Sequence, residues 1–120
     1  MLDRIKSVAL ASLIVVSTLL PVGAMAQAII YPAHITEVNS GWGDDAVGVT
    51  LDQPQVNPAK CPITDGIYNS PAGAGGNRTF LAAALTALAN KLTVTVVVSS
   101  TQCDPVGRPY LIAVSPSAPQ

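Results

Sequence analysis

The sequence has little charge, few aromatic residues and a single histidine. Of its 120 residues, 11% are charged and 4% are aromatic, and His34 is the only histidine. Six lysines and arginines face seven acidic residues, so the chain lacks the positive charge expected of a nucleic-acid-binding protein. A chain of this length predicts one small domain and excludes a multidomain enzyme.

Motifs for catalysis and for cofactor binding are also scarce. A serine nucleophile would need His34 as its base, and no G-x-S-x-G element is present, so we interpret His34 as a surface or packing residue. The glycines between Gly73 and Gly76 precede a predicted helix, but they lack the lysine and the spacing of a phosphate-binding loop. A zinc site would need four ligands. We therefore predict a protein that is not an enzyme and holds no cofactor or metal.

The first 26 residues have the order of a secretory signal peptide. Arg4 and Lys6 precede the apolar run from Val8 to Leu20, and Ala24-Met25-Ala26 provides a small-x-small cleavage site. The apolar run is shorter than the roughly 20 residues that a transmembrane anchor requires. We predict residues 1–26 as a signal peptide and a secreted or periplasmic protein with no membrane span after processing.

Both cysteines, Cys61 and Cys103, lie in the predicted mature chain. An even number of cysteines in an exported chain predicts a disulfide bond. Closing a loop of this length stabilises a small domain by about 4 kcal/mol in the chain-entropy model.

Alternation of apolar and polar residues predicts five strands. The clearest strand runs from Leu92 to Ser99, where valines fill one face. The Pro-containing end, residues 115–120, is predicted to be a flexible tail. The other expected strands are Ile29–Val38 with Pro32 at an edge or bulge, Val47–Leu51, a short one near Cys61–Tyr68, and Tyr110–Val114.

One helix is predicted from Arg78 to Lys91, capped by Asn77. Apolar residues lie on two faces of this helix, which indicates that other segments or another subunit pack against more than one of its sides. The predicted sheet-facing stripe consists of Leu81, Ala84, Leu85 and Leu88. The second apolar face consists of Phe80, Ala83 and Ala87, which we predict to be an oligomer interface.

Three strands, a helix and two strands form the element order of the OB-fold, a five-stranded Greek-key barrel. We predict this barrel over residues 27–114, with Cys61 and Cys103 within bridging distance. The alternative is an α+β fold, in which one helix packs across a four-stranded antiparallel sheet.

The loop joining the first two strands contains the only tryptophan, Trp42, between Gly41 and Gly43 and before Asp44 and Asp45. OB-folds use this loop to bind oligosaccharides or oligonucleotides. An indole stacks on the apolar face of a sugar, and carboxylates accept hydrogen bonds from sugar hydroxyls. We therefore predict a ligand site at Trp42, Asp44 and Asp45. The alternative is that Trp42 folds back and fills the end of the barrel.

The segment NRTFLAAALTALANKLTVTVVV, from Asn77 to Val98, is followed by Cys103 and then by YLIAV at Tyr110–Val114. This pattern resembles small secreted bacterial OB-fold proteins of the AB-type toxin binding-subunit family, which includes the B subunit of subtilase cytotoxin. The resemblance implies an OB-fold, a disulfide, a homopentameric ring, a partner that is an exported enzyme subunit, and a glycan or protein receptor. The alternative function is a small structural or interaction protein without a ligand pocket.

Overall fold

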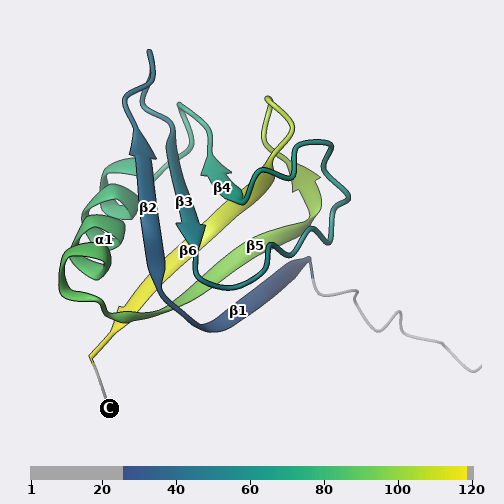
Figure 1. Cartoon of the computed structure of the whole chain (residues 1–120). Coiled ribbons are helices and arrows are strands. Elements are labelled where there is room, and N and C mark those ends of the chain that lie inside the picture. Colours follow the sequence, from purple (N-terminus) through teal and green to yellow (C-terminus); the bar gives the residue numbers. More distant parts are fainter. Residues whose placement is uncertain (1–25, 119–120) are drawn as a thin grey trace, which may run out of the picture.

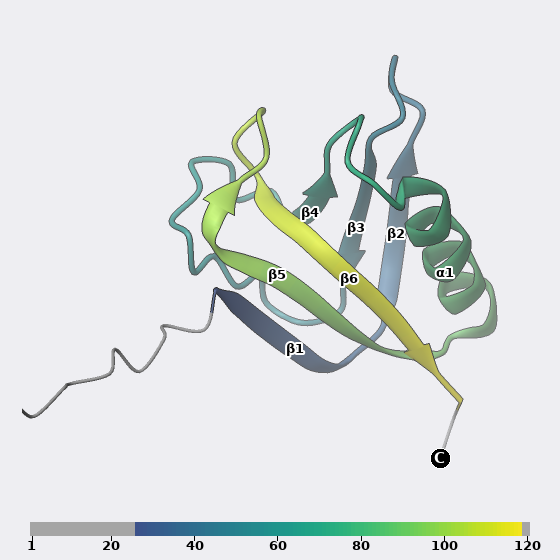
Figure 2. The same ribbon diagram turned by 180° about the vertical axis from the view of Figure 1, so that it is seen from behind.

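The computed structural model describes residues 26–118, which form a mainly β fold with one helix. The predicted signal peptide lies outside the described residues except for Ala26. Figure 1 shows the chain, and Figure 2 shows it from behind. The elements are β1 (Gln27–Ala33), β2 (Ile35–Ser40), β3 (Val47–Leu51), β4 (Ile67–Ser70), α1 (Asn77–Asn90), β5 (Thr93–Cys103) and β6 (Pro109–Ser117).

The six strands form one open sheet in the order β1-β5-β6-β4-β3-β2. The short contact between β4 and β6 is parallel, and the other neighbours are antiparallel. The predicted barrel has five strands and the predicted alternative has four, so both predictions give the wrong number of strands. The barrel prediction is also wrong because the sheet is open and does not close. The mainly β class with one helix is confirmed.

The additional strand arises because the predicted strand Ile29–Val38 is divided at His34. The half before His34 pairs with β5, and the half after it pairs with β3. The backbone N–H of His34 donates to Asp52 Oδ1 at 2.8 Å, and the N–H of Asp52 donates to the His34 carbonyl at 3.0 Å. These bonds hold the bend where the chain passes from one end of the sheet to the other.

Other strand boundaries also differ from the prediction, and β5 continues to Cys103, beyond the predicted end at Ser99. The third strand begins at Ile67, because the Asn57 side chain bonds to both the N–H and the carbonyl of Cys61, each at 2.8 Å, and holds that residue in a turn. The last strand continues to Ser117, which pairs with Thr93, so it enters the predicted tail. The strand Val47–Leu51 has the predicted bounds.

The disulfide between Cys61 and Cys103 is present, with the two Cα atoms 5.6 Å apart. It joins the loop before β4 to the end of β5, as the sequence predicted. The core beside it is small and mostly aliphatic. Its most completely buried side chains include Tyr68, Leu111, Val49, Val94, Val96 and Val98.

The helix α1 packs across one side of the sheet, against β2, β3 and β6 (Figures 1 and 2). Its buried face is rotated from the predicted one: Ala84 and Ala87 are buried, and Leu85 is 48% exposed. Of the predicted oligomer-interface residues, Ala87 is buried within its own subunit and so cannot contact another; Phe80, which packs against the core, and Ala83 are half-buried, and their interface role stays a prediction. No helix in residues 26–118 is long and apolar enough to cross a membrane.

Candidate functional site

A cleft of about 480 Å³ lies between the β2–β3 loop and the first turns of α1. Its size falls within the range of roughly 300–1,000 Å³ that is usual for small-ligand sites. One wall comes from the end of β2 and the following loop, including Gly41 and Asp45. The other wall comes from the glycine-rich segment before α1 and the first helical turns, including Gly76, Asn77, Arg78 and Leu81.

Asn77 joins the two walls of this cleft. Its Oδ1 accepts a hydrogen bond from Ser70 Oγ at 2.7 Å, while its Nδ2 donates to the carbonyls of Asp45 at 2.8 Å and Pro71 at 2.9 Å. The predicted N-cap role of Asn77 is therefore wrong. Gly76 occupies the cap position in the left-handed region, with φ of 88°, and no side chain caps the helix. The buried amide instead fixes the start of α1 to the β2–β3 loop.

Trp42 projects from the β2–β3 loop with 99% of its surface exposed. The alternative in which it fills the end of a barrel is therefore wrong. Gly41 and Gly43 on either side have φ of 73° and 90°, a region that favours glycine. Trp42 itself does not line the cleft, but its loop contributes Gly41 and Asp45 to the cleft wall.

The two predicted acidic site residues have different positions. Asp44 Oδ1 accepts a hydrogen bond from the N–H of Ala46 at 2.9 Å, which shapes the loop, and Asp44 does not line the cleft. Asp45 lines the cleft and is exposed. On the opposite wall lies Arg78, also exposed, and neither Asp45 nor Arg78 takes part in an ion pair within residues 26–118. The cleft thus offers both a carboxylate acceptor and a guanidinium donor.

His34 is not part of this cleft. Its Nδ1 lies 2.9 Å from Asp52 Oδ2, and both side chains are partly exposed. The backbone N–H of His34, together with the imidazole, holds the pKa of the Asp52 carboxyl below its ordinary value. The pair braces the bend between β1 and β2, which fits the prediction of a surface or packing residue.

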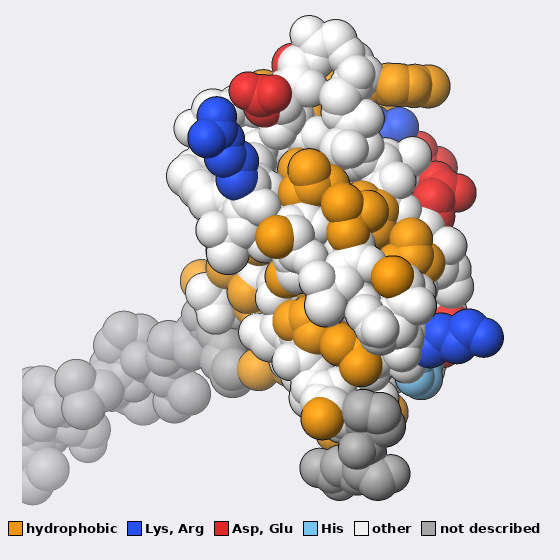
Figure 3. Space-filling view, turned by 90° about the vertical axis from the view of Figure 1, so that its left-hand side faces the viewer, with side chains coloured by type: hydrophobic (Ala, Val, Ile, Leu, Met, Phe, Trp, Pro, Cys, Tyr) orange, Lys and Arg blue, Asp and Glu red, His pale blue; other side chains and the backbone are white. Residues whose placement is uncertain are grey.

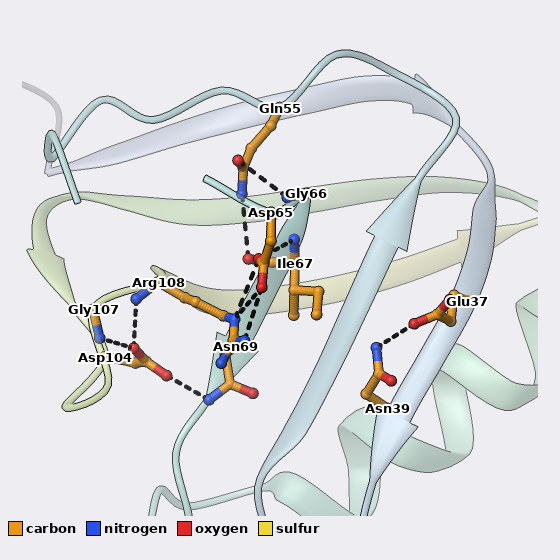
Figure 4. A network of polar contacts seen from close by, with 10 residues as sticks. All are labelled: Glu37, Asn39, Gln55, Asp65, Gly66, Ile67, Asn69, Asp104, Gly107 and Arg108. Atoms are coloured by element: carbon orange, nitrogen blue, oxygen red, sulfur yellow. Dashed lines mark hydrogen bonds and ion pairs between the residues drawn. The ribbon is translucent and has the colours of Figure 1, made fainter. Parts of the chain in front are cut away.

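A second polar cluster, shown in Figure 4, stabilises the β5–β6 turn. The buried Asp104 accepts hydrogen bonds from the N–H groups of Gly107 and Arg108, both at 2.7 Å, and from Asn69 Nδ2 at 2.6 Å. The Arg108 guanidinium pairs with Asp65 at 2.8 Å and 3.0 Å, and it holds the pKa of that carboxyl below its ordinary value. These polar groups have their hydrogen-bond partners within the fold, so we assign the cluster a structural role.

Sequence reasoning found one wall of the cleft and missed the other. Arg78 and Leu81 were placed only on a helix, and Gly73 and Gly76 only in a flexible turn. The residue that could have indicated this wall from the sequence is Asn77, because its side chain is polar and it begins a helix made largely of alanine and leucine. A side chain that bonds to Asp45 and Pro71 requires that helix to start against the tryptophan loop.

Within residues 26–118, no group of three His, Cys, Asp or Glu side chains is placed to hold a metal ion. Comparison of the chain with protein-family models, with curated proteins and with solved structures finds no significant match. The assignment of function therefore rests on the residues of the cleft and of its loop.

Proposed function

We propose that this protein is an exported, non-catalytic binding module that recognises a glycan at the cleft beside Trp42. The observation that carries the proposal is the 99% exposure of the only tryptophan, in a loop whose neighbouring residues line a cleft of about 480 Å³. An indole left in water contributes no packing energy to the fold, and tryptophan is enriched at binding interfaces.

The chemistry of the cleft suits a hydroxyl-rich ligand. The indole of Trp42 offers a flat apolar surface for the C–H face of a sugar ring. Asp45 accepts hydrogen bonds from hydroxyl groups, and Arg78 across the cleft donates them. Leu81 and Val47 add apolar lining between the two polar groups.

We further propose that the open sheet is a variant of the OB-fold whose first strand is divided at His34. If β1 and β2 are counted as two halves of one strand, the chain order becomes three strands, a helix and two strands. Both ends of the sheet then belong to that one bent strand. This strand order supports the resemblance to OB-fold proteins, in which the loop between the first two strands contacts ligands.

Ring formation and an exported enzyme subunit as partner stay part of this proposal. We place the ring interface on the outward apolar face of α1, where Leu85 is 48% exposed, instead of on the buried Ala87. Figure 3 looks onto the α1 side and shows apolar side chains gathered over this face. Export is supported by the Cys61–Cys103 disulfide, because such bonds persist in oxidising compartments.

The proposal is tested on a broad glycan array with the purified protein and two variants. Trp42→Ala is expected to lose at least tenfold in binding, and its melting temperature should stay unchanged because the side chain is exposed. Tyr31→Ala, which removes another exposed aromatic side chain, in β1 and outside the cleft, is the matched control and should bind normally. Equal binding by the Trp42→Ala variant, or no glycan bound by the parent protein, would contradict the proposal.

The alternative function is a small structural or interaction protein with no ligand pocket, and the exposed side chain of Leu85 favours it. The two proposals differ in the surface that binds: the face of α1 around Leu85 in this alternative, and the cleft beside Trp42 in the first proposal. Under this alternative, Leu85→Lys abolishes association with a protein partner, whereas Trp42→Ala has no effect on any measured binding.

A further inference from the structure

We propose that two copies of this chain associate through the outer edge of β1, which extends the sheet of one copy into that of the other. This edge lies at one end of the strand order, and among residues 26–118 no strand pairs with it. Figure 1 shows β1 crossing below the rest of the sheet, away from α1. The surface is therefore separate from the cleft proposed to bind glycans.

The hydrogen-bond pattern tells which backbone groups face this outer edge. The N–H of Ser100 donates to the carbonyl of Ala26, which places this pair at a hydrogen-bonded position of the β1–β5 ladder. Hydrogen-bonded and non-bonded positions alternate in an antiparallel pair. Ala28 and Ile30 therefore bond toward β5, while the backbone groups of Gln27 and Ile29 point away from it; the register shifts after Ile30, at Tyr31 and Pro32.

The side chains along this edge are apolar and exposed. Ile29 and Tyr31 are 61% and 59% exposed, whereas Ile30 between them is buried in the core. A groove of about 390 Å³ runs beside the edge, and Pro54 and Val56 form part of its other wall. An extended strand in this groove would gain both backbone hydrogen bonds and apolar contacts, as in strand addition to a sheet edge.

The absence of charge on the β1 edge indicates that the strand that pairs with it belongs to a second copy of this chain. Residues 27–33 contain no charged side chain, although exposed edge strands usually carry charges that prevent pairing. The other free edge, β2, has that protection, since Glu37 and Asn39 are exposed there and are joined by a hydrogen bond of 2.8 Å. Two β1 edges can approach each other without like-charge repulsion, so β1 is complementary to itself.

A two-fold axis at Ile29 gives the register of the pairing. Ile29 then faces Ile29 of the second copy, and Tyr31 faces Gln27. The backbone groups of Ile29 point outward, so the central pair can exchange two hydrogen bonds. A two-fold interface of this kind closes on itself and does not propagate into a fibre.

The test measures mass by analytical ultracentrifugation over a range of protein concentrations. The purified protein should associate through this interface, and Ile29→Lys should raise the dissociation constant at least a hundredfold and halve the mass. Val106→Lys is the matched control, because it places the same charge on another exposed apolar residue, in the turn between β5 and β6. This variant should retain the β1 pairing. Tyr31→Lys provides a second test if Ile29→Lys fails to fold.

Hydrogen exchange gives a separate readout at the level of single amides. The N–H groups of Gln27 and Ile29 should exchange at least tenfold more slowly as the protein concentration rises through the dissociation constant. A monomer at every concentration, or association that Ile29→Lys leaves unchanged, would overturn the proposal. Neither result bears on glycan binding, which the Trp42→Ala variant tests independently.

Discussion

Ser70 and Asn77 are joined by a buried hydrogen bond of 2.7 Å, which connects the end of β4 to the first residue of α1. Ser70 is fully buried, and Asn77 is 9% exposed. The same amide also bonds to the carbonyls of Asp45 and Pro71. This one side chain therefore ties the start of α1 to both β4 and the tryptophan loop.

Replacement of that side chain should be costly. We expect Asn77→Ala to lower the free energy of unfolding by about 1–3 kcal/mol, because it leaves the Ser70 hydroxyl and two carbonyls without their partner. Urea denaturation measures the loss. The matched control is Asn90→Ala, at the exposed end of the same helix, which should change the free energy by less than about 0.5 kcal/mol. Equal effects of the two substitutions would show that the buried amide is not needed.

Asp104 should be as important for the β5–β6 turn as Asn77 is for the cleft. Its carboxylate is 4% exposed and accepts hydrogen bonds from Gly107, Arg108 and Asn69. We expect Asp104→Ala to lower the free energy of unfolding by about 3 kcal/mol, since hydrogen bonds to a buried charge are strong. Asp44→Ala removes an exposed carboxylate with a single backbone bond and serves as the control in thermal denaturation. A loss no larger than that of Asp44→Ala would contradict the structural role of Asp104.

Reduction of the disulfide should destabilise the whole domain. In the chain-entropy model, a cross-link between residues 42 apart in sequence stabilises the folded state by about 4 kcal/mol. The double variant Cys61→Ser, Cys103→Ser should therefore unfold at a much lower urea concentration than the oxidised protein. A midpoint unchanged by the double substitution would mean that the core alone is sufficient.

The stability of the protein should fall in acid. Hydrogen bonds from the His34 backbone lower the pKa of Asp52, and the Arg108 guanidinium lowers the pKa of Asp65. Because both values are lower in the folded state, their contribution is complete above the ordinary pKa of about 4 and is lost as the pH falls below it. Both carboxyls are partly exposed, so solvent screening keeps each contribution small.

Urea unfolding measured from pH 7 to pH 2 tests this expectation. The parent protein should lose stability most steeply below pH 4, and the variant Asp52→Asn, Asp65→Asn should show a shallower decline over that range. An identical pH profile for the two proteins would exclude these carboxyls as the cause.

Much of the fold could be predicted from local pattern. The alternating valines of β5 and the Ala- and Leu-rich run of α1 identify their elements directly, and the disulfide followed from the two cysteines. The break at His34 could not be predicted, because Ile29–Val38 is rich in β-formers throughout. The division depends on hydrogen bonds to Asp52, which is distant in sequence.

The buried face of α1 was missed for a related reason. Alanine and leucine occur all round the helix, so its periodicity identifies no single face. The anchor is Asn77, whose bonds to Ser70, Pro71 and Asp45 set the rotation of the helix. That rotation buries Ala84 and Ala87 and leaves Leu85 exposed. The exposure of Trp42 likewise depends on the conformation of its loop, which the sequence left open between two alternatives.

The proposed binding site is tested most directly by the fluorescence of Trp42, because it is the only tryptophan and its emission reports on this site alone. With 99% of its surface exposed, the indole should emit like a fully hydrated tryptophan in the free protein. Addition of a glycan identified on the array should shift the emission to shorter wavelength, saturably, and protect it from quenching by acrylamide. If a glycan binds while the emission and quenching stay unchanged, recognition does not take place at Trp42, and the account is wrong.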